Sequence, residues 1–187
     1  MRIISGKFKK ANLFSVPGNT TRPTSDAVKE MIFSTLFDCK DSDVLDLYAG
    51  SGSLGLEALS RGAGYAEFVD GSQKSVSVIG KNIEKLNCKK QTRINRKKVL
   101  SFLGKCEKKY DLIFLDPPYN KGLINPTIEK IIEFDILKPG GRVVAEYSKK
   151  EKLKDFSETF EITRKEAGLT HIIFMNEKNC SDENTIL

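Results

Sequence analysis

The chain has 187 residues and a net charge of +6, a length that suits one domain with its own hydrophobic core. No stretch approaches the ~20 apolar residues of a membrane span, and the opening MRIISGKFKK has no apolar run long enough for a secretory signal. The four cysteines show no C-x-x-C spacing and there is one histidine, so we expect no metal site and predict a cytoplasmic protein with reduced thiols.

Residues 1–25 show no clear apolar period and are predicted to form a basic N-terminal arm or small hairpin. Basic residues cluster here and again in residues 81–109, which contain eleven basic residues and two acidic ones, Glu84 and Glu107. Such clusters favour a polyanionic partner, because basic side chains that neutralise phosphates release counterions. Lysines on an ordinary solvated surface give the same pattern, so charge alone leaves both interpretations open.

From Asp43 onward, short apolar runs alternate with segments long enough for helices. The clearest strand is YDLIFLD (110–116), and residues 73–87 have the apolar spacing of an amphipathic helix. The expected strands are residues 43–50, 65–72, 91–97, 110–116, 140–148, 160–168 and 169–178. The expected helices between them are residues 53–63, 73–87, 99–105 and 123–137.

This alternation predicts an α/β fold with a doubly wound, Rossmann-like, mostly parallel sheet covered by helices on both faces. The last two apolar runs are expected to close it as an antiparallel pair. Ligands of such sheets bind at the carboxyl ends of the strands, so the loops after Leu47, Val69 and Leu115 should face one crevice. We assign residues 26–178 to this domain and predict that residues 179–187 form a disordered tail.

A glycine-rich segment, GSGSLG (50–55), follows the first strand, and Asp70 comes twenty residues after Gly50. The spacing fits a dinucleotide-binding fingerprint. However, Asp46 would repel a pyrophosphate at this turn, whereas it would attract the ammonium end of S-adenosylmethionine. Asp70 can accept hydrogen bonds from ribose hydroxyls of either cofactor. We therefore expect S-adenosylmethionine, held by Asp46, Ala49, Gly50, Ser51, Gly52, Asp70 and, from a later loop, Asp116.

The strand 110–116 leads into the sequence LDPPYN. Two successive prolines lack backbone donors, fix φ and keep Asp116 out of helical space, which predicts a rigid, extended loop. The Asp116 carboxylate and the Pro117 carbonyl could each accept one N–H of an amine and hold it for reaction. Tyr119 could stack on the base that carries the amine. Since stacking requires only the ring, the Tyr119 hydroxyl is expected to matter little.

The segments DLYAGSGSLGLEALSRGA (46–63) and LDPPY (115–119) together resemble the amino-methylating class of Rossmann-fold methyltransferases. With RPTSDAVKEMIFSTL (22–36) added, residues 1–176 resemble the bacterial 16S rRNA (guanine-966-N2)-methyltransferase family. The resemblance implies methyl transfer from S-adenosylmethionine to the exocyclic N2 of a guanine in 16S rRNA. It also implies seven strands with the last antiparallel and a helix after Thr24.

The same resemblance makes ISGKFKKANL a basic arm that contacts RNA. We expect 16S rRNA within a small-subunit particle as the partner and a monomeric enzyme that does not bind membranes. The candidate RNA contacts are Lys7, Lys9, Lys10, Arg22, Lys97 and Lys98.

One stretch departs from the family pattern. A polar or acidic side chain is expected near the adenine amino group, but Arg96, Lys97 and Lys98 occupy that position. Backbone groups around Val99 are the alternative for reading the adenine.

Three other functions remain open at this point. A DNA adenine-N6 methyltransferase would use the same loop, although it usually needs a larger target-recognition domain. A non-enzymatic RNA-binding protein would not need the acids Asp46, Asp70 and Asp116. An NAD-dependent oxidoreductase is opposed by Asp46 and by the lack of a substrate domain.

Overall fold

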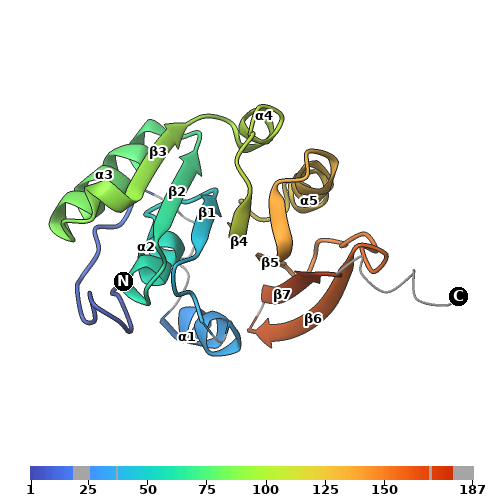
Figure 1. Cartoon of the computed structure of the whole chain (residues 1–187), viewed down its shortest axis with the longest axis horizontal. Helices are drawn as coiled ribbons and strands as arrows, with labels where there is room; N and C mark the ends of the chain where they lie inside the picture. Colours follow the sequence, from blue (N-terminus) through green and yellow to red (C-terminus); the bar gives the residue numbers. More distant parts are fainter. Residues whose placement is uncertain (19–25, 37, 169, 179–187) are drawn as a thin grey trace, which may run out of the picture.

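A single mixed sheet of seven strands runs through the protein, with helices on both of its faces (Figure 1). The structure, a computed structural model, describes residues 1–18, 26–36, 38–168 and 170–178. The strands are β1 (Asp43–Leu47), β2 (Tyr65–Asp70), β3 (Thr92–Arg96), β4 (Tyr110–Leu115), β5 (Leu137–Ser148), β6 (Phe160–Ala167) and β7 (Thr170–Glu177). The helices are α1 (Asp26–Thr35), α2 (Ser53–Ser60), α3 (Gln73–Lys85), α4 (Val99–Leu103) and α5 (Ile124–Glu133), with a 3₁₀ turn, η1 (Lys89–Gln91).

The strand order is β3-β2-β1-β4-β5-β7-β6. Strands β3, β2, β1, β4 and β5 are parallel, whereas β7 runs antiparallel to both β5 and β6. The predicted doubly wound sheet with an antiparallel closing strand is therefore confirmed. The strand order reverses between β1 and β4, which is where open α/β sheets form their ligand crevice.

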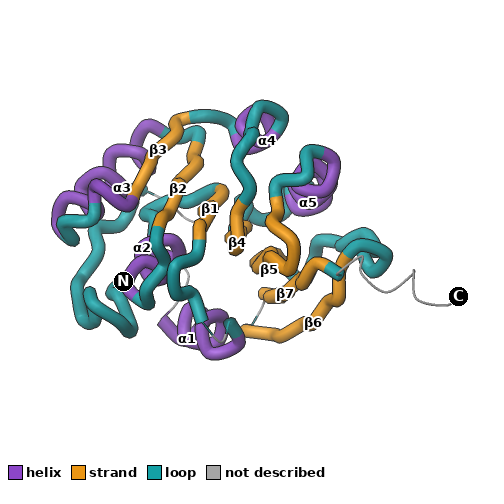
Figure 2. Tube along the Cα trace, in the orientation of Figure 1, coloured by secondary structure: helices purple, strands orange, loops and turns teal. Residues whose placement is uncertain are grey.

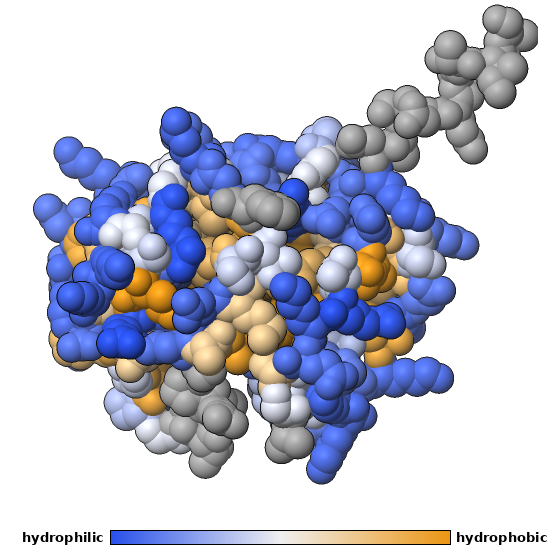
Figure 3. Space-filling model, turned by 90° about the horizontal axis from the view of Figure 1, so that it is seen from below, coloured by the Kyte–Doolittle hydropathy of each residue, from blue (hydrophilic) through white to orange (hydrophobic). Residues whose placement is uncertain are grey.

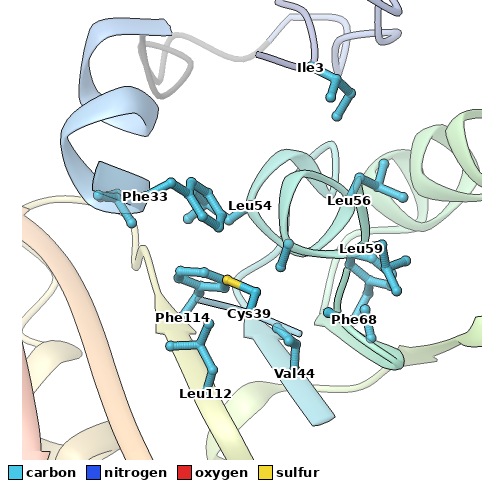
Figure 4. Close-up of a cluster of buried hydrophobic side chains, with 14 of the residues drawn as sticks. Ile3, Phe33, Cys39, Val44, Leu54, Leu56, Leu59, Phe68, Leu112 and Phe114 are labelled. Carbon is cyan, nitrogen blue, oxygen red and sulfur yellow. The ribbon is translucent and has the colours of Figure 1, made fainter. Parts of the chain in front are cut away.

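Successive residues along each central strand point alternately into two separate hydrophobic cores, one on each face of the sheet. Phe114 of β4 belongs to the core under α1, α2 and α3, where its ring centroid lies 5.6 Å from that of Phe33 (Figure 4). The next residue, Leu115, belongs to the core under α4 and α5. Side chains alternate faces along a strand, and both faces of this sheet are covered, so apolar residues on both faces make up most of its central strands.

Most elements end one to four residues from the expected position, and the two boundaries between α5 and β5 show why. Helix α5 ends at Glu133 instead of continuing to Leu137, since Asp135 turns to a left-handed φ of 48°. Strand β5 already begins at Leu137, which pairs with Tyr110 before the register shifts. The Pro-Gly-Gly segment (139–141) is thus an irregularity inside the strand and not a turn that precedes it. Apolar residues 136 and 137 suit a buried helix end and a buried strand start equally well.

The N-terminal segment is docked on the domain through buried polar contacts. Figure 2 shows it as loop beside α2 and α3. The Glu57 carboxylate of α2 accepts the backbone N–H groups of Ile4 (2.8 Å) and Ser5 (3.1 Å). Gly6 has a φ of 82°, and a Cβ there would lie 1.7 Å from the Ser60 carbonyl oxygen, so only glycine fits. Burial of Ile3 completes the attachment.

A fully buried lysine supports this attachment from α1. The Lys29 ammonium donates to the Arg2 carbonyl and lies 3.9 Å from the Glu57 carboxylate. Loss of solvation lowers the pKa of Lys29, while Glu57 and Asp26 partly offset the effect. The arm is therefore part of the folded domain over residues 1–18, and residues 19–25 lie outside the described part of the chain.

Hydrophobic residues on the face seen from below form small separate patches among hydrophilic ones (Figure 3). Within the described ranges, no helix has the length and hydropathy needed to cross a membrane. Cys39, Cys88 and Cys106 carry free thiols, and Cys180 lies outside the described residues, as does the predicted tail 179–187.

Candidate functional site

A cavity of about 720 Å³ opens at the carboxyl ends of β1, β2 and β4. Its walls combine the loops that follow these three strands with the start of α4 and with part of the N-terminal arm. The predicted site residues that line it are Asp46, Ala49, Gly50, Ser51, Asp70, Asp116, Pro117 and Tyr119. Gly52 is the one residue predicted for this site that does not line the cavity.

The glycines of the loop after β1 have different tasks. Gly50 adopts a φ of 57° and its N–H donates to Oδ2 of Asp70 at 2.9 Å, which ties the loop to β2. Gly52 begins α2 with a φ of 78°, and a Cβ there would lie 3.2 Å from the Phe68 ring. At Gly55 a Cβ would lie only 2.5 Å from that ring. Gly50 therefore shapes the cavity, whereas Gly52 and Gly55 allow α2 to pack closely on β2.

Asp46 is almost completely buried at the inner end of the cavity. Its Oδ2 accepts the Gly55 N–H at 2.9 Å. Burial raises the pKa of Asp46 to about 8, a shift that the Gly55 hydrogen bond opposes and the nearby Asp70 charge increases. A cationic group beside Asp46 would favour its ionised form, so this position suits an ammonium or sulfonium.

Asp70 closes the same end of the cavity from β2. Its two oxygens accept the N–H groups of Gly50 (2.9 Å) and Ser72 (2.8 Å). A carboxylate offers about four acceptor positions, so two remain for the hydroxyls of a ribose. Since Gly50 lets the backbone approach the cavity without a side chain, the residues present fit the predicted S-adenosylmethionine.

The Asp-Pro-Pro-Tyr loop (116–119) forms another part of the cavity wall. The Asp116 N–H still bonds to the Leu47 carbonyl at 3.5 Å, which carries the β1–β4 pairing one residue into the loop. Asp116 is half-buried, Pro117 is buried and Tyr119 is 37% exposed. Asp116, Pro117 and Tyr119 therefore line the same cavity as Asp46 and Asp70.

Glu146 of β5 is a partner of this loop that the sequence did not reveal. The Tyr119 hydroxyl donates to its Oε1 at 2.5 Å and lies 3.2 Å from the Thr170 hydroxyl. Burial raises the pKa of Glu146, and its Oε2 is buried with no hydrogen-bond partner among the described residues. The sequence feature that could have pointed to Glu146 is an acidic residue inside a predicted buried strand, RVVAEYS.

Other cavity residues were also missed. Tyr48 has a left-handed φ of 58° and its hydroxyl lies 2.9 Å from that of Thr127 on α5. The arm contributes Met1, Ser15 and Val16 to the cavity wall. No local pattern signals such arm residues, because their contacts depend on how the arm docks.

Five of the six candidate RNA contacts are exposed, namely Lys7, Lys9, Lys10, Lys97 and Lys98. Lys98 also borders the cavity beside Val99. Lys7 bonds to Gln91 at 2.9 Å, which joins the arm to the basic segment at η1. Arg22 lies outside the described residues.

Comparison with known proteins agrees with this geometry. A family model described as Conserved hypothetical protein 95 matches residues 1–176. YlbH of Bacillus subtilis, provisionally named an rRNA methyltransferase, is 37% identical over 95% of this chain and 100% of its own. Ribosomal RNA small subunit methyltransferase D of Haemophilus influenzae is 34% identical over 82% of this chain and 81% of its own. The solved structure of yhhF from Escherichia coli, provisionally described as a methyltransferase, is 29% identical, with a TM-score of 0.87 over 95% of this chain and 98% of its own.

Proposed function

Since the chain belongs to the Conserved hypothetical protein 95 family, the family of ribosomal RNA small subunit methyltransferase D, we propose that it methylates the exocyclic N2 of a guanine in 16S rRNA, of the guanine-966 type. The chain is an S-adenosylmethionine-dependent methyltransferase of that family. The observation that carries the proposal is the single cavity shared by Asp46, Asp70 and the Asp-Pro-Pro-Tyr loop. In that cavity, two acids that would hold the cofactor share one space with acceptors suited to an amine.

S-adenosylmethionine supplies an electrophilic methyl group when bound. Asp46 would hold its ammonium end, Asp70 its ribose hydroxyls, and backbone groups of the glycine loop its carboxylate. Lys98 and Val99 border the same cavity, so backbone groups there would contact the adenine in place of an acidic side chain.

Asp116 and the Pro117 carbonyl would orient the target amine. The lone pair of a guanine N2 is delocalised into the ring, which makes it a poor nucleophile. Two acceptors that each take one N–H hold the nitrogen in place and favour a tetrahedral geometry. Methyl transfer would leave a positive charge on the nitrogen, which the Asp116 carboxylate would stabilise until the nitrogen releases one proton to water.

The alternatives are less well supported. YlbH and ribosomal RNA small subunit methyltransferase D are named for rRNA, which argues against DNA adenine as the substrate. A binding protein without activity would have no use for buried Asp46 beside an intact amine-holding loop. We propose that the enzyme acts as a monomer in the cytoplasm on rRNA within a small-subunit particle.

Mass-spectrometric mapping of 16S rRNA from cells that lack this protein tests the proposal. We expect one N2-methylguanine to disappear and to return when the wild-type gene, but not an Asp116→Ala variant, is supplied. In vitro, naked 16S rRNA and purified small-subunit particles would be compared as substrates. An unchanged methylation map would contradict the proposal.

A further inference from the structure

A second, smaller groove lies beside the cofactor cavity, between the arm and α3. Of the described residues, those that line it are Phe14, Ser15, Pro17, Val78, Lys81, Glu84 and Lys85. Phe14 is 48% exposed, which is more than any other large hydrophobic residue in the described ranges. Ser15 lines both the groove and the cofactor cavity, so the two spaces adjoin.

Although the Phe14 side chain is exposed, hydrogen bonds hold its backbone in place. Asn82 of α3 is fully buried, and its side-chain amide both accepts the Phe14 N–H (2.8 Å) and donates to the Phe14 carbonyl (3.1 Å). The same amide donates to the Ser51 carbonyl of the glycine loop at 2.9 Å. Phe14 is therefore held in a set position relative to the cofactor loop, and its exposure does not result from a loose chain.

The charges around Phe14 favour an anionic partner with a flat apolar part. The Lys85 ammonium lies 4.9 Å from the ring centroid, and Lys81 lines the same groove, with Glu84 the one acid. An aromatic ring flanked by lysines is the combination that binds single-stranded nucleic acid, because the ring stacks on a base and the ammonium groups neutralise phosphates.

We propose that Phe14 is a stacking platform for an unpaired RNA nucleotide next to the one whose base enters the cavity. The base stacks on the exposed ring, and Lys81 and Lys85 bind the adjoining phosphates. The exchange of an exposed ammonium–ring contact for base stacking is favourable, since stacking is the stronger of the two. The inference rests on the proposed function in one respect, namely that the substrate is RNA.

The test measures binding of a single-stranded RNA oligonucleotide that carries 2-aminopurine, a base whose fluorescence falls when it stacks. We expect Phe14→Ala and Phe14→Leu to weaken binding about tenfold, the loss of one stacked base, and to abolish the quenching. Phe14→Trp should retain both. Phe134→Ala is the matched control, because Phe134 is also exposed (38%) and has the Lys130 ammonium 4.8 Å from its ring, yet does not line the cavity or the groove.

Unchanged affinity and quenching in Phe14→Ala would overturn the inference. A loss seen with small-subunit particles but not with the oligonucleotide would also overturn it, because the groove would then bind a protein. Cofactor titration and methyl transfer by the wild-type enzyme are measured in parallel. If these fail while oligonucleotide binding depends on Phe14, the proposed function is wrong and the stacking platform stands.

Discussion

The hydroxyl of Tyr119 donates a hydrogen bond to Oε1 of Glu146 across 2.5 Å, so the ring at the tip of the Asp-Pro-Pro-Tyr loop is attached to strand β5. Reasoning from the sequence assigned Tyr119 only a stacking role, for which the ring is enough. This hydrogen bond gives the hydroxyl a structural role, because it fixes the position of the ring. It also gives a buried carboxylate its hydrogen-bond donor.

We therefore expect Tyr119→Phe to reduce the rate of methyl transfer about five- to thirtyfold, since a lost hydrogen bond that leaves a buried acceptor unsatisfied costs ~1–2 kcal/mol. Tyr119→Ala should cost more, because stacking of the base is lost as well. Single-turnover kinetics of Tyr119→Phe, Glu146→Gln and the double variant would measure the coupling. Strictly additive effects would show that the two groups act independently.

Cofactor binding should release a proton from Asp46. With its pKa at about 8, this carboxyl is mostly protonated at pH 7 in the free protein, and a bound ammonium would favour the ionised form. Affinity should then rise with pH up to about 8. Calorimetry at pH 7 in buffers of different ionisation enthalpy should detect about one proton released. Asp46→Asn should abolish the release and weaken affinity about ten- to a hundredfold, whereas a pH-independent affinity of the wild type would contradict the assignment.

The same pKa shift predicts how the stability of the free protein varies with pH. Asp46 binds its proton more tightly in the folded chain than at the ordinary aspartate pKa of 3.8. The stabilisation is therefore complete below about pH 4 and is lost as the pH rises through about 8. Urea unfolding across this range should show Asp46→Asn with a flatter pH dependence than the wild type.

Asp116→Ala should separate chemistry from cofactor binding. Although Asp116 is also expected to contact the cofactor, Asp46, Asp70 and the glycine loop remain to hold it, so we expect cofactor affinity to fall at most about threefold. Single-turnover methyl transfer should fall ~10²-fold or more, the usual scale for one preorganised electrostatic partner. Asp116→Asn keeps the shape and removes the charge, so it should be nearly as slow. A misfolded Asp116→Ala would make the acid structural, and a folded, fully active variant would mean that other groups hold the amine.

Two glycine-to-alanine changes inside helices should have opposite effects on stability. At Gly55 of α2 the new methyl group would lie 2.5 Å from the Phe68 ring, so we expect a loss of ~1–3 kcal/mol. At Gly80 of α3 its nearest neighbour would be 4.0 Å away, so the better helix propensity of alanine should stabilise by ~0.5–1 kcal/mol. Urea unfolding of both variants provides the comparison, and equal effects would contradict the close packing of α2.

Lysines of the arm should contribute RNA affinity and not chemistry. Lys9→Glu with Lys10→Glu should raise the KM for rRNA and reduce the steepness of its salt dependence, while cofactor affinity stays unchanged. Lys105→Glu with Lys109→Glu is the control, because both residues precede β4 and line neither the cavity nor the groove. Loss of the exposed Lys109–Asp135 ion pair should change stability little. Identical salt dependence in the wild type and the arm variant would make these lysines an ordinary solvated surface.

The sequence alone determined the sheet and most of the cavity. Short, mostly apolar runs such as YDLIFLD are typical of strands buried on both faces, and the order of strands and helices then predicts that the loops after β1, β2 and β4 meet at one crevice. The chemistry of these loops is local: a glycine turn, an acid at a strand end and two prolines act through their own backbone preferences. Asp46, Asp70 and Asp116 could therefore be assigned to one site before any coordinates existed.

The tertiary structure alone decided the partnerships between distant parts of the chain. Asn82 bonds to Phe14, 68 residues away, and Glu146 accepts from Tyr119 across 27 residues. The basic arm or small hairpin expected from the sequence is bonded to Glu57, and Met1, Ser15 and Val16 of this arm line the cavity. Sequence patterns report which face of an element is apolar, but a buried amide or carboxylate looks like any polar residue until its partner is known. Burial makes unsatisfied polar groups costly, so these pairs form only once the whole fold brings their members together.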